Sequence, residues 1–236
     1  MNKIICVAGF GDDASMFAPL VEAAADSVSQ YYPISLPGFG SPIPEDQTTS
    51  LESLATFLIA KAAEIGADTV LAHSVASIIA SIAATRPNSP LTSIISLEGN
   101  LTPEDAYFSG TAAQYSDPGE FRTAFLDRLD RMATNDEIIA RYRGVVEHAD
   151  PKALWELGCD AHDFSNKQSP GDRLQTVANT AYLYNPENLP GTSLSWLEKN
   201  ELFKLKLPGA SHWASLDQPH LLARVIEDIL VGWTRA

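Results

Sequence analysis

The stretch Leu71-Ala72-His73-Ser74-Val75-Ala76 decides the fold, because it places one serine between two apolar segments of different character. Residues 69–72 are a compact run typical of a buried strand, and residues 75–85 are small and apolar, as in a closely packed helix. The positions two residues before and two residues after the serine are both alanine. Small residues are needed where a strand turns sharply into a helix, because larger side chains would collide with neighbouring elements. The stretch therefore predicts a strand, a tight turn that carries Ser74, and a helix.

Two roles for Ser74 are compatible with this turn. A serine that precedes a helix most often caps it, by accepting a hydrogen bond from a backbone N–H of the first turn. A serine on a strained strand-to-helix turn can instead be a nucleophile, for which the usual pattern is G-x-S-x-G. Here alanine replaces both glycines, which adds a methyl group where crowding is greatest. Taken alone, the stretch favours the capping role.

Strand-like and helix-like segments alternate on both sides of this turn. The helix formed by residues 51–62 is the clearest, with Ser50 placed to cap its start and Gly66 to end it. Such alternation predicts an α/β fold with a mostly parallel, doubly wound sheet covered by helices on both faces. The other predicted strands are 3–8, 30–36, 92–97, 180–184 and 202–207, and the other predicted helices are 15–25, 75–85 and 218–233.

The alternation is interrupted between residues 101 and 172, where charged helical stretches and scattered aromatic residues contain no convincing strand. We interpret residues 101–172 as a helical cap inserted into a core made of residues 1–100 and 173–236. Aromatic side chains of the cap could line a substrate pocket, but we expect most of them to form the small core of the cap itself. These side chains are Tyr107, Phe108, Phe121, Phe125, Trp155 and Phe164.

Composition excludes several classes of protein. Of the 236 residues, 45% are hydrophobic and 19% are charged, which is typical of a globular protein and not of a disordered one. The formal net charge of −14 disfavours binding to nucleic acid or to anionic membranes, because both would repel the chain. No apolar stretch is long enough to span a bilayer, and the first apolar run ends in acidic residues, unlike a signal peptide. With only two cysteines, Cys6 and Cys159, we expect free thiols and a cytoplasmic protein.

A histidine near the end of the chain changes the interpretation of Ser74. It lies in Pro208-Gly209-Ala210-Ser211-His212-Trp213, on a predicted loop that follows the last strand and precedes the last helix. A serine must lose its proton to attack a carbonyl, and a neutral imidazole is the usual acceptor. A loop histidine on its own is more often merely solvated, but at this place in the order of elements it is the expected base.

No cofactor or metal ion is predicted. His148, His162 and His220 lack the spacing of metal ligands with any cluster of Cys, Asp or Glu. The turn Gly9-Phe10-Gly11 lacks the third glycine and the downstream acid of a dinucleotide site.

Taken together, these motifs resemble those of the α/β hydrolases over essentially the whole length of the chain. The turn at Ala8-Gly9-Phe10-Gly11, the stretch Leu36-Pro37-Gly38-Phe39-Gly40-Ser41, the Ser74 turn and the His212 loop follow one another in family order. The resemblance implies an α/β-hydrolase fold in which Ser74 is the nucleophile and His212 is its base.

The resemblance also implies an oxyanion hole and a pocket. The hole is formed by two backbone N–H groups, which are those of Phe10 and Val75 in this chain, and it stabilises the negative charge that develops on the carbonyl oxygen. The expected pocket residues are Gly9, His73 and Trp213.

The third member of a catalytic triad is less obvious. The family usually places an acid after the strand before the last one, where this chain has Asn188. An amide can orient an imidazole but cannot balance the charge of an imidazolium. We therefore choose Glu98, which follows strand 92–97, with Glu187 in reserve. Some family members, the haloalkane dehalogenases among them, resemble this arrangement, but their nucleophile is a carboxylate, so Ser74 argues against dehalogenation.

The expected function is hydrolysis of an ester of a small or medium acyl group through an acyl-enzyme intermediate, with a small-molecule substrate as the partner. Thioesters, lactones and C–C bonds flanked by carbonyls pass through similar intermediates and remain open. A noncatalytic ligand-binding homologue with the same fold also remains open. The sequence does not indicate an oligomeric state.

Overall fold

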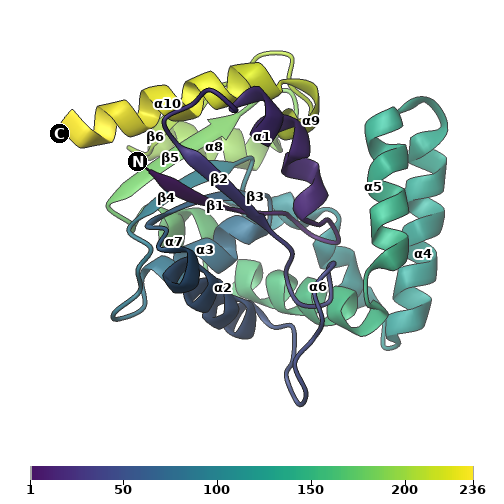
Figure 1. The fold of residues 1–236 in the computed structure, drawn as a ribbon. Helices are drawn as coiled ribbons and strands as arrows, with labels where there is room; N and C mark the ends of the chain where they lie inside the picture. Colours follow the sequence, from purple (N-terminus) through teal and green to yellow (C-terminus); the bar gives the residue numbers. More distant parts are fainter. Residues whose placement is uncertain (1, 236) are drawn as a thin grey trace.

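A computed structural model describes residues 2–235, in which strands and helices alternate as predicted (Figure 1). The strands are β1 Lys3–Val7, β2 Gln30–Ile34, β3 Thr69–His73, β4 Ser93–Leu97, β5 Asn179–Tyr184 and β6 Phe203–Lys206. The α-helices are α1 Ala18–Ala23, α2 Leu51–Ile65, α3 Ala76–Ala84, α4 Pro118–Met132, α5 Glu137–His148, α6 Pro151–Lys167, α7 Pro170–Leu174, α8 Gly191–Lys199, α9 Ala214–Asp217 and α10 Pro219–Arg235. Short 3-10 helices are η1 Ala14–Phe17, η2 Pro103–Ala106, η3 Ser109–Gln114 and η4 Ala133–Asn135.

The six strands form one parallel sheet in the order β2-β1-β3-β4-β5-β6. The chain runs outward from β1 to β2 and then returns to add β3 on the other side of β1. This reversal of direction creates a switch point between β1 and β3, and ligands of open parallel sheets bind outside the carboxyl ends of the strands at such a point. The loops after β1 and β3 carry Phe10 and Ser74, so the topology places the candidate site at this edge.

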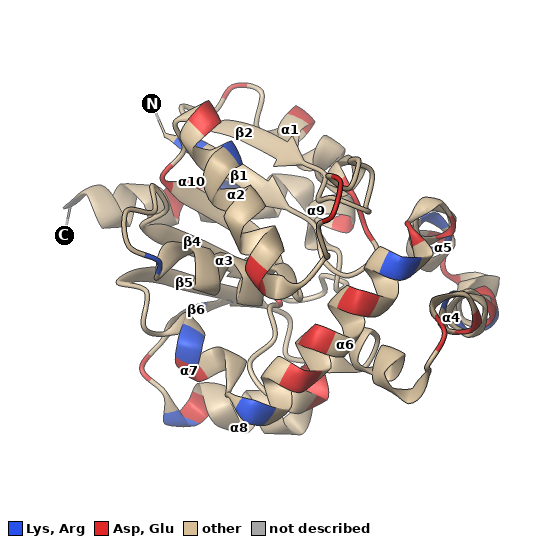
Figure 2. Cartoon of the chain, turned by 90° about the horizontal axis from the view of Figure 1, so that it is seen from below, with Lys and Arg blue, Asp and Glu red and all other residues tan. Residues whose placement is uncertain are grey.

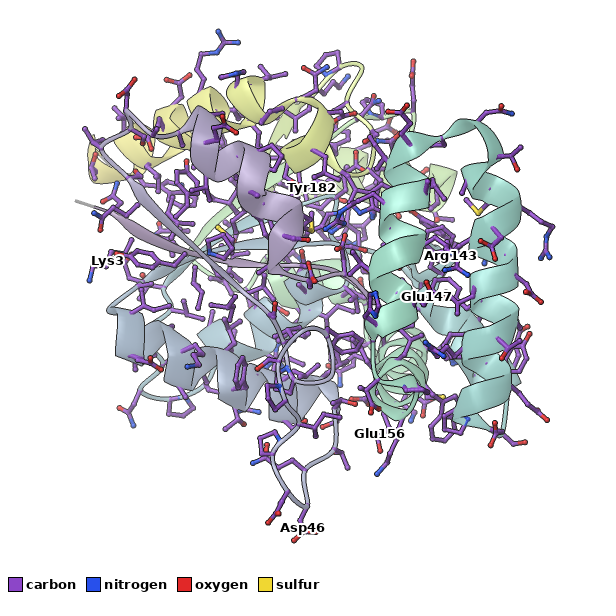
Figure 3. The ribbon with its side chains drawn as sticks, turned by 45° about the vertical axis from the view of Figure 1, so that its right-hand side comes forward. Lys3, Asp46, Arg143, Glu147, Glu156 and Tyr182 are labelled. Carbon is purple, nitrogen blue, oxygen red and sulfur yellow. The ribbon has the colours of Figure 1, made fainter. Side chains whose placement is uncertain are left out.

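Helices cover both faces of the sheet, which confirms the predicted doubly wound fold (Figure 1). Helices α1 and α10 pack together over one face, and α2, α3 and α7 lie on the other. The central strands β3 and β4 are therefore buried along their whole length. Tyr182 on β5 is among the largest fully buried side chains and lies near the centre of the molecule in Figure 3.

Helix α2 begins and ends where its sequence predicts. The Ser50 side chain accepts a hydrogen bond from the backbone N–H of Ser53, and Gly66 ends the helix in a left-handed conformation with φ of 74°. Glycine reaches this region without the steric penalty that other residues meet.

All the described elements between β4 and β5 are helical. Helices α4 and α5 form an antiparallel pair to one side of the sheet (Figure 1), joined by an ion pair of Arg143 on α5 with Asp130 on α4 at 2.7 Å. Arg143 also pairs with Glu147 one turn along its own helix at 2.6 Å. Figure 3 shows Arg143 and Glu147 together on α5. Helix α6 packs against η3, and α7 packs against α3. The division into a cap of 101–172 and a two-part core stays a prediction, and the first and last residues of that core lie outside the described residues.

The structure differs from the predicted elements in two places. The helix expected over 15–25 is split into η1 and α1, because Pro19 lacks a backbone N–H and is accommodated in the first turn of a new helix. Helices α8 and α9 were not predicted. Helix α8 is the crossover that two neighbouring parallel strands, β5 and β6, require. No helix among residues 2–235 is long and apolar enough to cross a membrane.

Candidate active site

Ser74 lies on a strained turn directly after β3. Its φ is 55°, a left-handed value that residues other than glycine seldom adopt, and its backbone N–H donates to the carbonyl of Leu97 at 3.0 Å. The flanking Ala72 and Ala76 are completely buried, so the space around the turn accepts a methyl group but little more. The two alanines therefore satisfy the same demand for small residues that glycine meets in the usual pattern.

The loop after β1 touches this turn. A Cβ atom built on Gly9 would lie 2.8 Å from the Cβ of Ser74 and 3.0 Å from Nδ1 of His73. Among residues 2–235, no acceptor is found for the backbone N–H of Phe10 or of Val75. Neither amide is used within the described part of the chain, and their role as an oxyanion hole stays a prediction.

His212 and Glu98 form a close pair at the same edge of the sheet. The Nδ1 atom of His212 lies 2.8 Å from Oε2 of Glu98. Glu98 follows β4 directly, is 4% exposed and has a left-handed φ of 46°. Because a carboxylate oxygen only accepts, Nδ1 is the protonated nitrogen of a neutral His212, which leaves Nε2 free to accept a proton. This is the tautomer that a general base needs.

Two asparagines hold the second oxygen of Glu98. Oε1 accepts hydrogen bonds from the backbone N–H of Asn185 and from Nδ2 of Asn188, both at 2.8 Å. The Nδ2 atoms of both asparagines also donate to the carbonyl of Ala210, on the loop that carries His212. Asn188, at the usual position of the acid, therefore ties Glu98 to the histidine loop. Glu187 is exposed, and only its backbone N–H is engaged nearby, with Asn185.

His73 supports the histidine loop from the other side. Its Nε2–H donates to the backbone carbonyl of His212 at 2.9 Å, and the two imidazole rings are 4.5 Å apart. Burial, and the neighbouring His212, hold the pKa of His73 well below its usual value. His73 is therefore neutral and acts as a hydrogen-bond donor to the loop.

A small cavity lies between these groups, and its empty space of about 340 Å³ includes open solvent at its mouth. Ser74, His212 and the three predicted pocket residues, Gly9, His73 and Trp213, all line it. The rest of the lining comes from the loop after β1 and from the helical segment: Phe10, Asp12, Asp105, Tyr107, Phe108, Ser109 and Tyr142. Of the cap aromatics, Tyr107 and Phe108 line this cavity, whereas Phe121 and Phe125 are buried and pack against Phe10.

Helix α5 holds the loop after β1 by two contacts that the sequence analysis missed. The Nη1 atom of Arg141 donates to both carboxylate oxygens of buried Asp12, at 2.6 and 2.7 Å, and Trp213 donates to the same carboxylate at 3.1 Å. Burial raises the pKa of Asp12, and Arg141 opposes this increase. The Tyr142 hydroxyl donates to the carbonyl of Phe10 at 2.5 Å. The one indication of these contacts in the sequence was an acidic residue, Asp12, directly after Gly11.

The three remaining histidines lie away from this site. His148 and His220 are exposed, and His162 is partly exposed beside Asp163. Within residues 2–235, no group of three or more His, Cys, Asp or Glu side chains is arranged to hold a metal ion.

Several solved structures share this fold at low sequence identity. A thermophilic esterase from Thermogutta terrifontis matches with a TM-score of 0.74 and 18% identity over 98% of this chain and 90% of its own. A structure of AqdC, which cleaves the ring of the Pseudomonas quinolone signal, matches with 0.75 and 15% over 98% and 92%. An N-acyl homoserine lactone degrading enzyme matches with 0.72 and 16% over 97% and 93%. These likenesses show the fold alone.

The family comparison covers nearly the whole chain. No curated protein sequence matches it. The model of the alpha/beta hydrolase family matches residues 4–225, which include the loop after β1, the Ser74 turn, Glu98 and the His212 loop. The chain therefore belongs to the alpha/beta hydrolase family.

Proposed function

We propose that this hydrolase cleaves carboxylic esters through an acyl-enzyme formed on Ser74. The Ser74 hydroxyl attacks the ester carbonyl while His212 takes its proton, and the Phe10 and Val75 amides bind the oxyanion. His212 then returns the proton to the departing alcohol. Water, activated by the same imidazole, releases the acid and regenerates Ser74. Glu98 stabilises the imidazolium in both halves of the reaction.

The observation that carries this proposal is the 2.8 Å contact between His212 Nδ1 and Glu98 Oε2 beside the cavity that Ser74 lines. The pairing sets the histidine tautomer, and burial of Glu98 keeps water from competing for the hydrogen bond. The two left-handed residues, Ser74 and Glu98, directly follow the adjacent strands β3 and β4. Strained backbone of this kind is retained where function demands it.

The test is covalent labelling with a fluorophosphonate, which reacts with activated serines. We expect stoichiometric modification of the wild-type protein at Ser74, located by peptide mass spectrometry, and none of Ser74→Ala. Ser211→Ala, which alters a nearby loop serine outside the proposed triad, is the matched control and should label normally. An inert Ser74 in the folded wild-type protein would favour a noncatalytic binding role.

A substrate panel then distinguishes the bond that is cleaved. Esters of increasing acyl length, a thioester, a lactone and a diketone with a cleavable C–C bond are compared by kcat/KM. We expect the highest values for esters of short acyl groups, because the cavity is small. If the enzyme prefers one of the other classes while Ser74 is still labelled, Ser74 remains the nucleophile and the proposed substrate class is wrong.

A further inference from the structure

Besides Glu98 and Asp12, a third carboxylate lies at the catalytic cavity, and it belongs to the lining. Asp105 belongs to η2, in the segment that follows Glu98 along the chain, and is held firmly in place. Its Oδ2 atom accepts hydrogen bonds from the backbone N–H groups of Leu101 and Thr102, each at 2.8 Å, and from the Ser193 hydroxyl at 2.6 Å. With the Thr102 side chain these bonds form a capping box at the start of η2.

Oδ2 of Asp105 accepts all of these hydrogen bonds. Oδ1 of Asp105 has no donor among residues 2–235, and it is not one of the buried polar atoms that lack a partner, so it is open to solvent. Because the residue lines the cavity, a ligand there can reach this oxygen. Capping of η2 accounts for Oδ2 and leaves Oδ1 without a structural role.

The charge of Asp105 is also uncompensated, unlike that of the other two carboxylates at the cavity. Asp12 is paired with Arg141 and Glu98 with His212, whereas in the described part of the chain no cationic side chain lies within ion-pair distance of Asp105. Burial raises the pKa of Asp105, and only hydrogen bonds lower it. A partly buried carboxylate without a cationic partner favours a cation brought by a ligand.

The surroundings suit a cationic ligand. The aromatic rings of Tyr107 and Trp213 line the same cavity, and ring faces attract ammonium groups, whereas the Phe108 ring is already covered by the Arg128 guanidinium, 4.8 Å from its centroid. The chain carries a net charge of −14, and acidic residues are spread over its surface (Figure 2). Such a field draws cations toward the molecule and repels anions.

We propose that Asp105 forms a subsite for an ammonium group, so that the enzyme prefers esters that carry a protonated amine over uncharged or anionic esters of the same shape. The inference rests on the proposed ester hydrolysis, and it names the substrate class. Asp105 is a specificity-determining residue in this scheme, and Ser74, His212 and Glu98 carry out the chemistry unchanged.

The experiment compares matched esters on wild type and Asp105→Asn. Dimethylaminoethyl acetate and its uncharged isostere isoamyl acetate place the amine on the alcohol side. The methyl ester of dimethylaminobutyric acid and its carbon isostere place it on the acyl side, and monomethyl glutarate supplies an anion. We expect the ratio of kcat/KM for amine over isostere to fall roughly tenfold in Asp105→Asn for at least one pair. Comparing the two proteins cancels the difference in intrinsic reactivity between the esters.

Two controls separate charge from structure. Ser193→Ala removes one hydrogen bond to Oδ2 but keeps the carboxylate, and it should preserve the wild-type ratio. In the wild-type protein, added salt should reduce the preference for the amine, because screening weakens attraction between charges, and this measurement needs no substitution. An unchanged ratio in a folded Asp105→Asn, or a salt-independent preference, would overturn the proposal.

Binding measurements on an inactive variant test the subsite independently of catalysis. Calorimetry on Ser74→Ala, which cannot form an acyl-enzyme, should show tighter binding of the amine ester than of its isostere, and the difference should vanish in Ser74→Ala/Asp105→Asn. Equal binding of both esters refutes the subsite even if the wild-type protein is an active esterase. Selective binding without turnover would keep the subsite and refute the proposed function.

Discussion

At the scale of single residues, Glu98 is the least expected part of the site, because its backbone is strained and its carboxylate is almost completely buried. Three hydrogen bonds, from Asn185, Asn188 and His212, satisfy it. A carboxylate with both oxygens bonded is fixed in direction, so it holds the imidazole in one tautomer as well as balancing its charge.

Glu98→Gln should therefore remove activity without unfolding the protein. The glutamine amide would donate to Nδ1 of His212, which would shift the proton to Nε2 and leave no acceptor for the Ser74 hydroxyl. We expect kcat to fall on the order of a thousandfold, with KM nearly unchanged, in steady-state ester hydrolysis. Glu187→Gln, at an exposed carboxylate that follows the next strand, β5, is the control and should retain full activity. The opposite pattern would make Glu187 the acid.

Sequence alone suggested Ser74, His212 and Glu98 because each stands in a recognisable place: a turn with small neighbours, a loop before the last helix, and the end of a strand. Their roles stay predictions. It could not suggest Asn185 or Asp105, whose importance depends on partners far along the chain that only folding brings close. The left-handed backbone of Glu98 was equally invisible, since glutamate has no local preference for it.

At the scale of elements, the loop after β1 and the turn after β3 must approach each other for the oxyanion amides to face one carbonyl oxygen. Gly9 permits this approach, because any side chain there meets Ser74 and His73. Gly144, in the middle of α5, has free space instead, because a Cβ atom built there would meet no neighbouring atom within 4 Å.

Gly9→Ala should push the loop away from Ser74. A Cβ atom 2.8 Å from the Cβ of Ser74 cannot be accommodated without a shift, and displacement of one oxyanion donor costs roughly 3 kcal/mol in the transition state. We expect kcat/KM, and the rate of fluorophosphonate labelling, to fall on the order of a hundredfold. Gly144→Ala, as the matched substitution, should leave both rates unchanged and raise helix stability by about 1 kcal/mol. Equal activities of the two variants would show that the approach of the loop is not needed.

Prediction of elements from sequence succeeded where the pattern is local. Helix α2 has its cap, its apolar spacing and its terminal glycine in one continuous segment, and the structure agrees with it. Helix α8 was missed because its requirement comes from topology, namely the crossover between β5 and β6. The contacts of α5 with Asp12 and Phe10 were missed for the same reason, since they join distant segments.

At the scale of the whole molecule, alternation of strands and helices was sufficient to predict the fold, because a parallel sheet must be covered on both faces by its crossovers. The same burial that makes the core leaves several ionisable groups without water. Burial raises the pKa values of the Cys6 thiol and of three tyrosines, Tyr31, Tyr142 and Tyr182. These groups stay protonated in the folded protein at alkaline pH.

This set of groups predicts loss of stability in alkali. In the unfolded chain a cysteine ionises near pH 8.5 and a tyrosine near pH 10. Above about pH 9 the unfolded chain therefore releases protons that the folded chain keeps. The free energy of unfolding should keep its full value below that pH. It should decline as pH rises further, by about 1.4 kcal/mol per pH unit for each such group. Urea unfolding at a series of pH values measures this slope.

Tyr31→Phe isolates one contribution to the decline. The Tyr31 hydroxyl is buried and has no hydrogen-bond partner among residues 2–235, so its removal should leave stability at neutral pH unchanged or slightly higher. Above about pH 10 the variant should lose stability less steeply than wild type, by about 1.4 kcal/mol per pH unit, because one fewer proton is released on unfolding. Tyr32→Phe, which removes the neighbouring hydroxyl that donates to exposed Gln30, is the matched control. Parallel curves for wild type and Tyr31→Phe would mean that this hydroxyl ionises equally well in the folded and unfolded chain, and that alkaline unfolding has another origin.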